Sequence, residues 1–151
     1  MIQPNTQKHI VLYADDDPDD LMLVQEAFDH YTENVEVVTA TDGEAALAYL
    51  SRLDHFHPSP CLIILDINMP RLNGKETLKK IRSLPRFSNV PVVLFTTSSS
   101  VTDMEFARQH QVGFITKPLD VRQLESIADQ FVQHCTDEIK KNLRKQLGEN
   151  K

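Results

Sequence analysis

Short apolar segments recur along the chain, separated by longer segments in which apolar residues have a helical spacing. The short segments predict five β-strands, at His9–Ala14, Asn34–Thr39, Cys61–Leu65, Val90–Phe95 and Gly113–Thr116. Three of them are almost continuously apolar, which is typical of parallel strands that are buried on both faces.

The segments between the predicted strands are amphipathic. Three of them gather apolar residues on one helical face: Leu21, Val24, Phe28 and Tyr31, then Ala46, Leu47, Leu50 and Leu53, and finally Leu124, Ile127, Ala128 and Phe131. Weaker helical patterns cover residues 74–83 and 102–111. Because strand and helix alternate five times, we expect an α/β fold, a doubly wound parallel sheet with helices on both faces and right-handed crossovers.

The composition is that of one globular domain. The chain has 151 residues, 40% hydrophobic and 25% charged, which is enough to bury one substantial core. It has no apolar run of membrane-spanning length and no apolar signal segment at its N-terminus, so we expect a cytoplasmic protein without membrane contact. Cys61 and Cys135 are far apart and near no pair of histidines, which favours two buried thiols over a metal knuckle or a disulfide framework.

The negative charge is concentrated in one place. Five aspartates account for most of the formal net charge of −6: Asp15, Asp16, Asp17, Asp19 and Asp20. Nucleic-acid binding requires a basic face, and this cluster would repel a phosphate backbone. We therefore expect no direct DNA binding.

Polar residues follow four of the five predicted strands. Asp15 and Asp16 come after the first strand and Asp66 after the third, while Thr96 ends the fourth and Lys117 follows the fifth. In a parallel α/β sheet, ligands bind beyond the carboxyl ends of the strands, near the point where the strand order reverses. We therefore expect these side chains to form one site.

Part of the acidic cluster has a structural explanation. Asp17 can cap the first helix, and Asp19 and Asp20 favour the positive end of its dipole. Asp15 and Asp16 precede the cap, and together with Asp66 they would repel one another unless a cation joined them. Magnesium, which binds a few protein oxygens and keeps several waters, suits such a site; the alternative is an acidic rim that holds no ion.

At this point the sequence resembles the receiver domains of response regulators in two-component signalling, including the chemotaxis-type and phytochrome-associated single-domain regulators. The resemblance covers a receiver domain at residues 8–134, followed by a helical extension at 135–151, and it rests on YADDDPDD, LDINMPRLNG, PVVLFTTS and GFITKP in this order. It implies a flavodoxin-like (βα)5 fold with strand order 2-1-3-4-5.

The resemblance also implies roles for individual residues. Asp66 would accept a phosphoryl group from a histidine kinase. Mg²⁺ would be held directly by Asp16 and Asp66, mainly through water by Asp15, and by the backbone carbonyl of Asn68. Lys117 would contact the phosphoryl oxygens, whereas its alternative role is that of a surface turn lysine.

Two further residues resemble the family's switch. Thr96 would hydrogen-bond a phosphoryl oxygen and Phe114 would change its rotamer, and the peptide between Lys117 and Pro118 would be cis. The alternatives are helix or turn capping for Thr96 and core packing for Phe114. The chain departs from the family pattern at Phe114, where Tyr is frequent, and at Thr97, where a small residue such as Ala is common.

We therefore predict a single-domain response regulator that signals by protein contact or phosphorelay. Its expected partners are a sensor histidine kinase, for which the resemblance suggests the phytochrome type, and a downstream protein. Its own chemistry would be limited to self-catalysed phosphotransfer and slow autodephosphorylation. The alternative is a receiver-like docking module that is never phosphorylated. A flavodoxin-type FMN site is disfavoured because the acidic cluster would repel phosphate, and an aspartyl phosphatase would place its nucleophile on the first strand.

Apolar residues continue at intervals of four beyond Phe131, at Cys135, Ile139, Leu143 and Leu147. They predict a helix that extends or follows the fifth one. Membrane contact is disfavoured because residues 136–151 carry five basic and three acidic residues and no aromatic anchor. The stripe is expected either to pack back on the receiver or to form a homodimer interface.

Overall fold

The computed structural model describes residues 8–31, 33–117 and 126–148. Its centre is a parallel sheet in the order β2-β1-β3-β4-β5, which confirms the predicted topology. The strands are β1 (His9–Ala14), β2 (Val35–Ala40), β3 (Leu62–Leu65), β4 (Val92–Thr96) and β5 (Gly113–Thr116). β4 begins later than predicted because Pro91 has no N–H to donate, although its carbonyl accepts a hydrogen bond from Ile63 at 2.9 Å.

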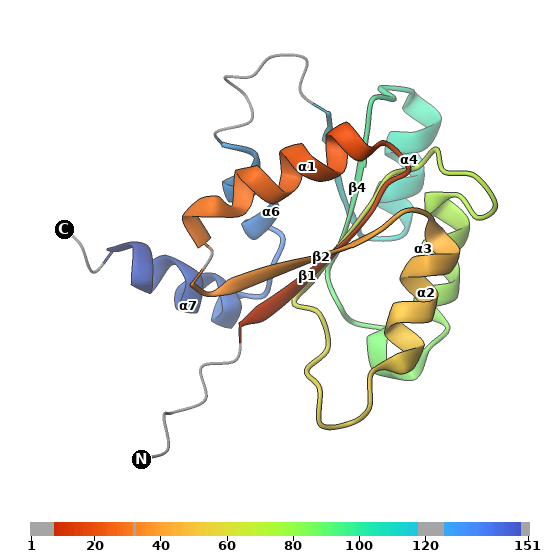
Figure 1. The fold of residues 1–151 in the computed structure, drawn as a ribbon. Helices are drawn as coiled ribbons and strands as arrows, with labels where there is room; N and C mark the ends of the chain where they lie inside the picture. The colour runs from red at the N-terminus through yellow and green to blue at the C-terminus, as the bar shows by residue number, and fades with distance from the viewer. Residues whose placement is uncertain (1–7, 32, 118–125, 149–151) are drawn as a thin grey trace.

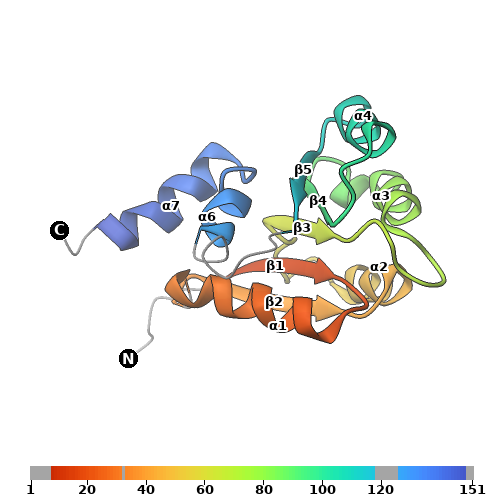
Figure 2. The same ribbon diagram turned by 90° about the horizontal axis from the view of Figure 1, so that it is seen from above.

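Helices cover both faces of this sheet, as Figures 1 and 2 show. The α-helices of the described residues are α1 (Pro18–Ala27), α2 (Gly43–Arg52), α3 (Gly74–Arg82), α4 (Val101–Gln109), α6 (Ile127–Val132) and α7 (Asp137–Gly148). The described part of the chain also forms two short 3-10 helices, η1 (Phe28–Tyr31) directly after α1 and η2 (Pro85–Phe87). The predicted first helix therefore ends in a tighter turn, and Leu124 of the predicted fifth helix lies outside the described residues.

The two faces of the sheet form two separate apolar layers. Along β1, Val11 and Tyr13 belong to the first core cluster, which contains residues of α1, α6 and α7, whereas Leu12 belongs to the second, which contains residues of α2, α3 and α4. Successive side chains of a strand point to opposite faces. Since β1 is buried on both sides, its continuous apolar sequence is explained.

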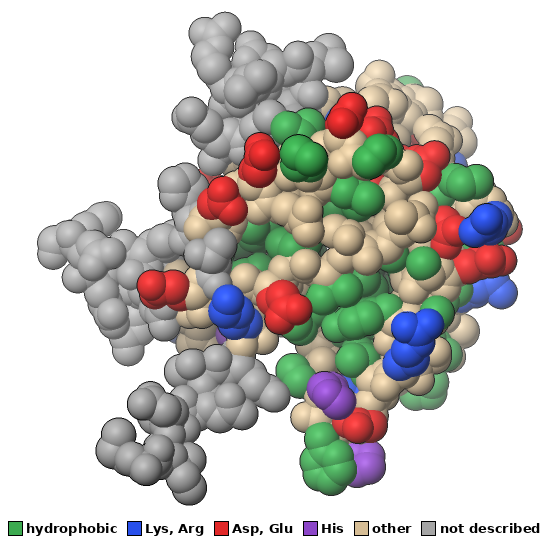
Figure 3. All heavy atoms as spheres, viewed as in Figure 1, with side chains coloured by type: hydrophobic (Ala, Val, Ile, Leu, Met, Phe, Trp, Pro, Cys, Tyr) green, Lys and Arg blue, Asp and Glu red, His purple; other side chains and the backbone are tan. Residues whose placement is uncertain are grey.

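The start of α1 follows the sequence prediction. Asp17 is the N-cap, its side chain accepts a hydrogen bond from the backbone N–H of Asp19 at 2.9 Å, and Pro18 is the first helical residue. Acidic side chains gather along this helix on the face shown in Figure 3. Asp19 and Asp20, in the first turn, favour the positive end of the helix dipole, which lies beside the carboxyl edge of the sheet.

The C-terminal extension folds back on the receiver. α7 is separated from α6 by the turn at residues 133–136, and Ile139 and Leu143 pack against the first core cluster, with Leu143 only 1% exposed. Cys61 and Cys135 are both free and buried in the same cluster, which confirms their structural interpretation. The side chain of Leu147, the last residue of the predicted stripe, is not among those that the structure describes. Among the described helices, none is long and apolar enough to span a bilayer.

Candidate functional site

Backbone hydrogen bonds continue one residue beyond three strands and so fix where the polar side chains begin. The N–H of Asp15 donates to Ala40 at 3.0 Å, and that of Asp66 donates to Ala14 at 3.0 Å. The N–H of Lys117 donates to Thr96 at 2.8 Å. The three polar residues therefore leave the sheet at the same edge, as the sequence predicted.

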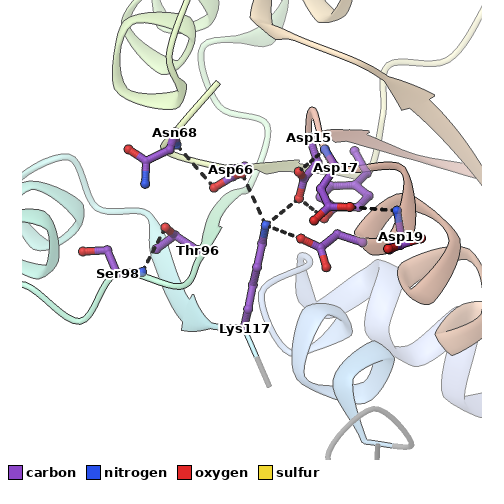
Figure 4. A network of polar contacts seen from close by, with 10 residues as sticks. Asp15, Asp17, Asp19, Asp66, Asn68, Thr96, Ser98 and Lys117 are labelled. Carbon is purple, nitrogen blue, oxygen red and sulfur yellow. Dashed lines mark hydrogen bonds and ion pairs between the residues drawn. The ribbon is translucent and has the colours of Figure 1, made fainter. Parts of the chain in front are cut away.

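Lys117 is the centre of this site. Its Nζ lies 2.8 Å from Asp15, 2.7 Å from Asp20 and 3.3 Å from Asp66, and Figure 4 shows it reaching from the end of β5 towards the carboxylates. The Lys117 side chain is 9% exposed, so it is not a surface turn lysine. One ammonium group is thus shared by three carboxylates.

Asp15 is the most enclosed of these carboxylates and is fully buried. It accepts hydrogen bonds from the hydroxyl of Tyr13 and, at 2.9 Å, from the backbone N–H of Asp17. With Lys117, three donors fix its orientation. Burial, followed by the hydrogen bond to Asp15, raises the pKa of Tyr13, so its hydroxyl stays a donor.

The charges of the site are not balanced. Burial raises the pKa of Asp66 to about 6, the negative charge of Asp15 adds to this rise, and Lys117 opposes it. Burial alone would lower the pKa of Lys117, but its hydrogen bonds to Asp15 and Asp20 raise it above the ordinary value. Lys117 therefore stays charged. The burial of Asp66 and the charge of Asp15 disfavour the ionised form of the Asp66 carboxylate.

Asp15, Asp16 and Asp66 have the arrangement of a metal site. Each offers a carboxylate oxygen, and these atoms lie within 4.8 Å of one another. Asp16 is exposed whereas the other two are buried, so water can complete a coordination shell on one side. A set of oxygen ligands with unbalanced negative charge fits a hard divalent cation such as Mg²⁺.

The loop after β3 is held tightly against Asp66. The backbone N–H of Asn68 donates to the Asp66 carboxylate at 3.3 Å, and the N–H of Gly74 donates to Ile67 at 2.9 Å. A Cβ added at Gly74 would lie 2.2 Å from the carbonyl oxygen of Asp66. Gly74 is therefore required where α3 begins, because any side chain would displace the backbone of the candidate phosphoacceptor.

Thr96 lies at the end of β4, fully buried, and its hydroxyl accepts a hydrogen bond from the backbone N–H of Ser98 at 3.2 Å. The hydroxyl of Ser98 donates to Asp103 in α4 at 2.7 Å, and Asp103 pairs with Lys75 of α3 at 2.5 Å. Thr96 thus caps the turn that follows it. This turn is connected through Ser98 and Asp103 to two helices.

Phe114, the second predicted switch residue, lies in β5 and is partly buried against the second core cluster. This agrees with the packing alternative and leaves the rotamer change a prediction. The predicted cis peptide before Pro118 lies outside the described residues.

Two residues of the site were not predicted from the sequence. The sequence pattern places Tyr13 in a strand and Asp20 at a helix terminus. In the structure Tyr13 donates a hydrogen bond to Asp15, and Asp20 accepts one from Lys117. Tyr13 precedes Asp15 by two residues, so both side chains lie on the same side of the chain, and this spacing was an available signal. The contact of Asp20 with Lys117 joins residues 97 positions apart, and no local pattern indicates it.

The comparisons with known proteins agree with this architecture. Residues 11–129 match the family model described as the response regulator receiver domain. The response regulator Rcp1 of Synechocystis sp. (strain ATCC 27184 / PCC 6803 / Kazusa) is 33% identical over 118 residues, which cover 76% of this chain and 80% of Rcp1. A crystal structure of the Mn²⁺-bound form of Rcp1 is 30% identical with a TM-score of 0.73, covering 85% of this chain and 97% of that one.

A further solved structure is similar to this chain. It is that of the phosphorylated cyanobacterial phytochrome response regulator RcpA, 31% identical with a TM-score of 0.74, covering 86% of this chain and 98% of that chain. The family match extends over most of the sequence and includes β2 to β5 and all but the first two residues of β1. This chain belongs to the response regulator receiver domains of two-component signalling.

Proposed function

We propose that this protein is a phosphorylated response regulator in which Asp66 accepts a phosphoryl group in a Mg²⁺-dependent reaction. The observation that carries the proposal is the convergence of Asp15, Asp16 and Asp66 within 4.8 Å, with Lys117 in contact with two of them. A receiver used only for docking has no need of a buried, charge-imbalanced site. The Mn²⁺-bound form of Rcp1 and the phosphorylated form of RcpA support the same assignment.

The chemistry follows from the charges. A carboxylate oxygen of Asp66 attacks the phosphorus of a phosphohistidine, a P–O bond forms, the P–N bond breaks, and the imidazole takes up a proton. Lys117 offers its ammonium group to the phosphoryl oxygens. Asp15, Asp16, Asp66 and the backbone carbonyl of Asn68 would hold a Mg²⁺ ion, which would supply further positive charge against those oxygens.

The proposed switch begins at Thr96. Its hydroxyl is a buried acceptor next to the site, and turning it towards a phosphoryl oxygen would withdraw it from the N–H of Ser98. The turn after β4 would then change, and with it the exposed face of α4, while Phe114 would take the space that is released. The donor is a sensor histidine kinase, which the likeness to RcpA suggests is of phytochrome type, and the output is contact with a protein or phosphorelay.

Homodimerisation through the extension stays a prediction. A symmetric partner would cover an exposed apolar stripe, but Ile139 and Leu143 of this stripe are already packed against the protein's own core. Light scattering of the full chain and of a chain truncated after His134 tests it. A full chain that is monomeric at high concentration, with and without phosphorylation, would exclude it.

The central proposal is tested with acetyl phosphate and Mg²⁺. Intact-mass spectrometry is expected to show one added phosphoryl group on the wild type and none on Asp66→Asn, while Asp19→Asn, an exposed aspartate on the same side of the molecule, serves as a matched control and keeps the label. Labelling that survives in Asp66→Asn would refute the assignment. A wild type that takes no label from acetyl phosphate or from any histidine kinase of its organism would favour the docking module.

A further inference from the structure

The shortest ion pair of Lys117 is made with a residue outside the candidate metal triad. Lys117 Nζ lies 2.7 Å from Asp20, compared with 2.8 Å from Asp15 and 3.3 Å from Asp66. Asp20 lies in the first turn of α1, and its side chain is 24% exposed. Lys117 is therefore drawn towards α1 and makes its longest contact with the carboxylate that would carry the phosphoryl group.

This arrangement has a consequence for phosphorylation, and here the inference rests on the function proposed above. A phosphoryl group on Asp66 adds negative charge that requires the Lys117 ammonium group. In the structure that ammonium group is shared with Asp20, which would compete with the phosphoryl group for it. Lys117 is the cation that Asp20 contacts among the described residues. Moving the Lys117 ammonium group from Asp20 to the phosphoryl group costs free energy, and this cost increases with the strength of the Lys117–Asp20 ion pair.

We infer that Asp20 is a positioning residue that holds Lys117 in the unphosphorylated arrangement and so weakens the binding of a phosphoryl group at Asp66. Among the described residues its carboxylate pairs with Lys117, and it acts through that contact. If Asp20 instead held Lys117 equally in both states, its removal would leave phosphoryl binding unchanged or weaken it.

Asp19 provides a matched control. It is the preceding residue of the same helix turn, it is exposed, and within the described residues Lys117 pairs with Asp15, Asp20 and Asp66 but not with it. Adjacent helical residues differ in direction by about 100°, which explains why only Asp20 faces Lys117. Asp19→Asn and Asp20→Asn remove the same formal charge from nearly the same place, so a difference between them isolates the contact.

The experiment measures the affinity for beryllofluoride, a non-covalent analogue of the phosphoryl group, in the presence of Mg²⁺ by ¹⁹F NMR. Asp20→Asn is expected to bind it about fivefold more tightly than the wild type, which corresponds to about 1 kcal/mol at 1.4 kcal/mol per factor of ten. Asp19→Asn is expected to stay within about twofold of the wild type, because Asp19 is exposed and does not pair with Lys117. Thermal unfolding of each variant shows that the fold is intact.

A double-mutant cycle tests whether the effect passes through Lys117. In a Lys117→Ala background, Asp20→Asn is expected to gain no more than Asp19→Asn does. Unchanged or weaker binding by Asp20→Asn, or the same gain with and without Lys117, would overturn the inference and leave the proposed function standing. A wild type that does not bind beryllofluoride at all, with Mg²⁺ present, would overturn both.

Discussion

Replacing the candidate phosphoacceptor is expected to stabilise the fold in the absence of metal. Burial and the charge of Asp15 raise the pKa of Asp66 from 3.8 to about 6. A raised folded-state pKa means that this group's stabilising contribution is present below about pH 4 and is lost as the pH rises through about 6. At pH 7.5 the ionised carboxylate therefore opposes folding, and Asp66→Asn removes that charge while keeping the shape.

The size of the effect follows from the shift. Two pKa units correspond to about 3 kcal/mol, and this value includes the opposing contribution of Lys117 at 3.3 Å. Water at the exposed side of the site screens the charge, and Asn lacks the Lys117 ion pair. We therefore expect Asp66→Asn to gain about 1–2 kcal/mol, which is a rise of about 0.5–1 M in the urea midpoint for a slope of about 2 kcal/mol/M.

The assay is urea unfolding in EDTA at pH 7.5 and at pH 4.5, followed by circular dichroism. The gain is expected to shrink at pH 4.5, where Asp66 is largely protonated in the fold, and added Mg²⁺ is expected to stabilise the wild type more than the variant. Asp16→Asn, at the exposed position of the triad, is the control and is expected to change the midpoint less. A lower midpoint for Asp66→Asn at pH 7.5, or a gain that does not depend on pH, would refute the reasoning.

Three other predictions test separate parts of the structure. Gly74→Ala places a Cβ 2.2 Å from a backbone carbonyl oxygen and is expected to lower the free energy of unfolding in urea by about 2–3 kcal/mol. Gly113→Ala, whose Cβ would meet the movable ring of His134, is expected to lower it less. Equal losses for the two variants would contradict this account. Leu143→Ala removes a side chain that is 1% exposed and should cost about 2–4 kcal/mol; no loss would mean that α7 does not pack on the core. Thr96→Ala should still accept a phosphoryl group but lose the NMR shifts of α4 that accompany it, and a response like that of the wild type would exclude Thr96 as transmitter.

The fold was predictable because it depends on local patterns. Strand and helix alternate in the sequence, and a strand such as β1, with neighbours on both faces, carries an apolar residue at nearly every position. The site was predictable for a related reason. Once the strands are parallel, the residues after them must meet at one edge, so Asp15, Asp66 and Lys117 could be placed together without knowing any distance.

The parts that were missed depend on non-local packing. The helix dipole already explains an acidic residue at the position of Asp20, in the first turn of α1. Its contact with Lys117 depends instead on where α1 lies relative to β5. The extension shows the same limit. The spacing of Ile139 and Leu143 predicts an apolar face but not which surface covers it, and the structure covers it with the first core cluster.

The site cannot relieve its own charge imbalance. Three aspartates, Asp15, Asp20 and Asp66, pair with one ammonium group. Asp16 adds a fourth carboxylate, whose oxygen lies within 4.8 Å of oxygens of Asp15 and Asp66. The backbone beside Asp66 is closely packed, because a Cβ added at Gly74 would lie only 2.2 Å from the Asp66 carbonyl oxygen, so Asp66 has little freedom to move away. Relief must then come from a bound cation or from protonation of Asp66. Because a cation and a phosphoryl group act on the same set of charges, their binding and the stability of the fold must be coupled, and a change in any one of the three alters the other two.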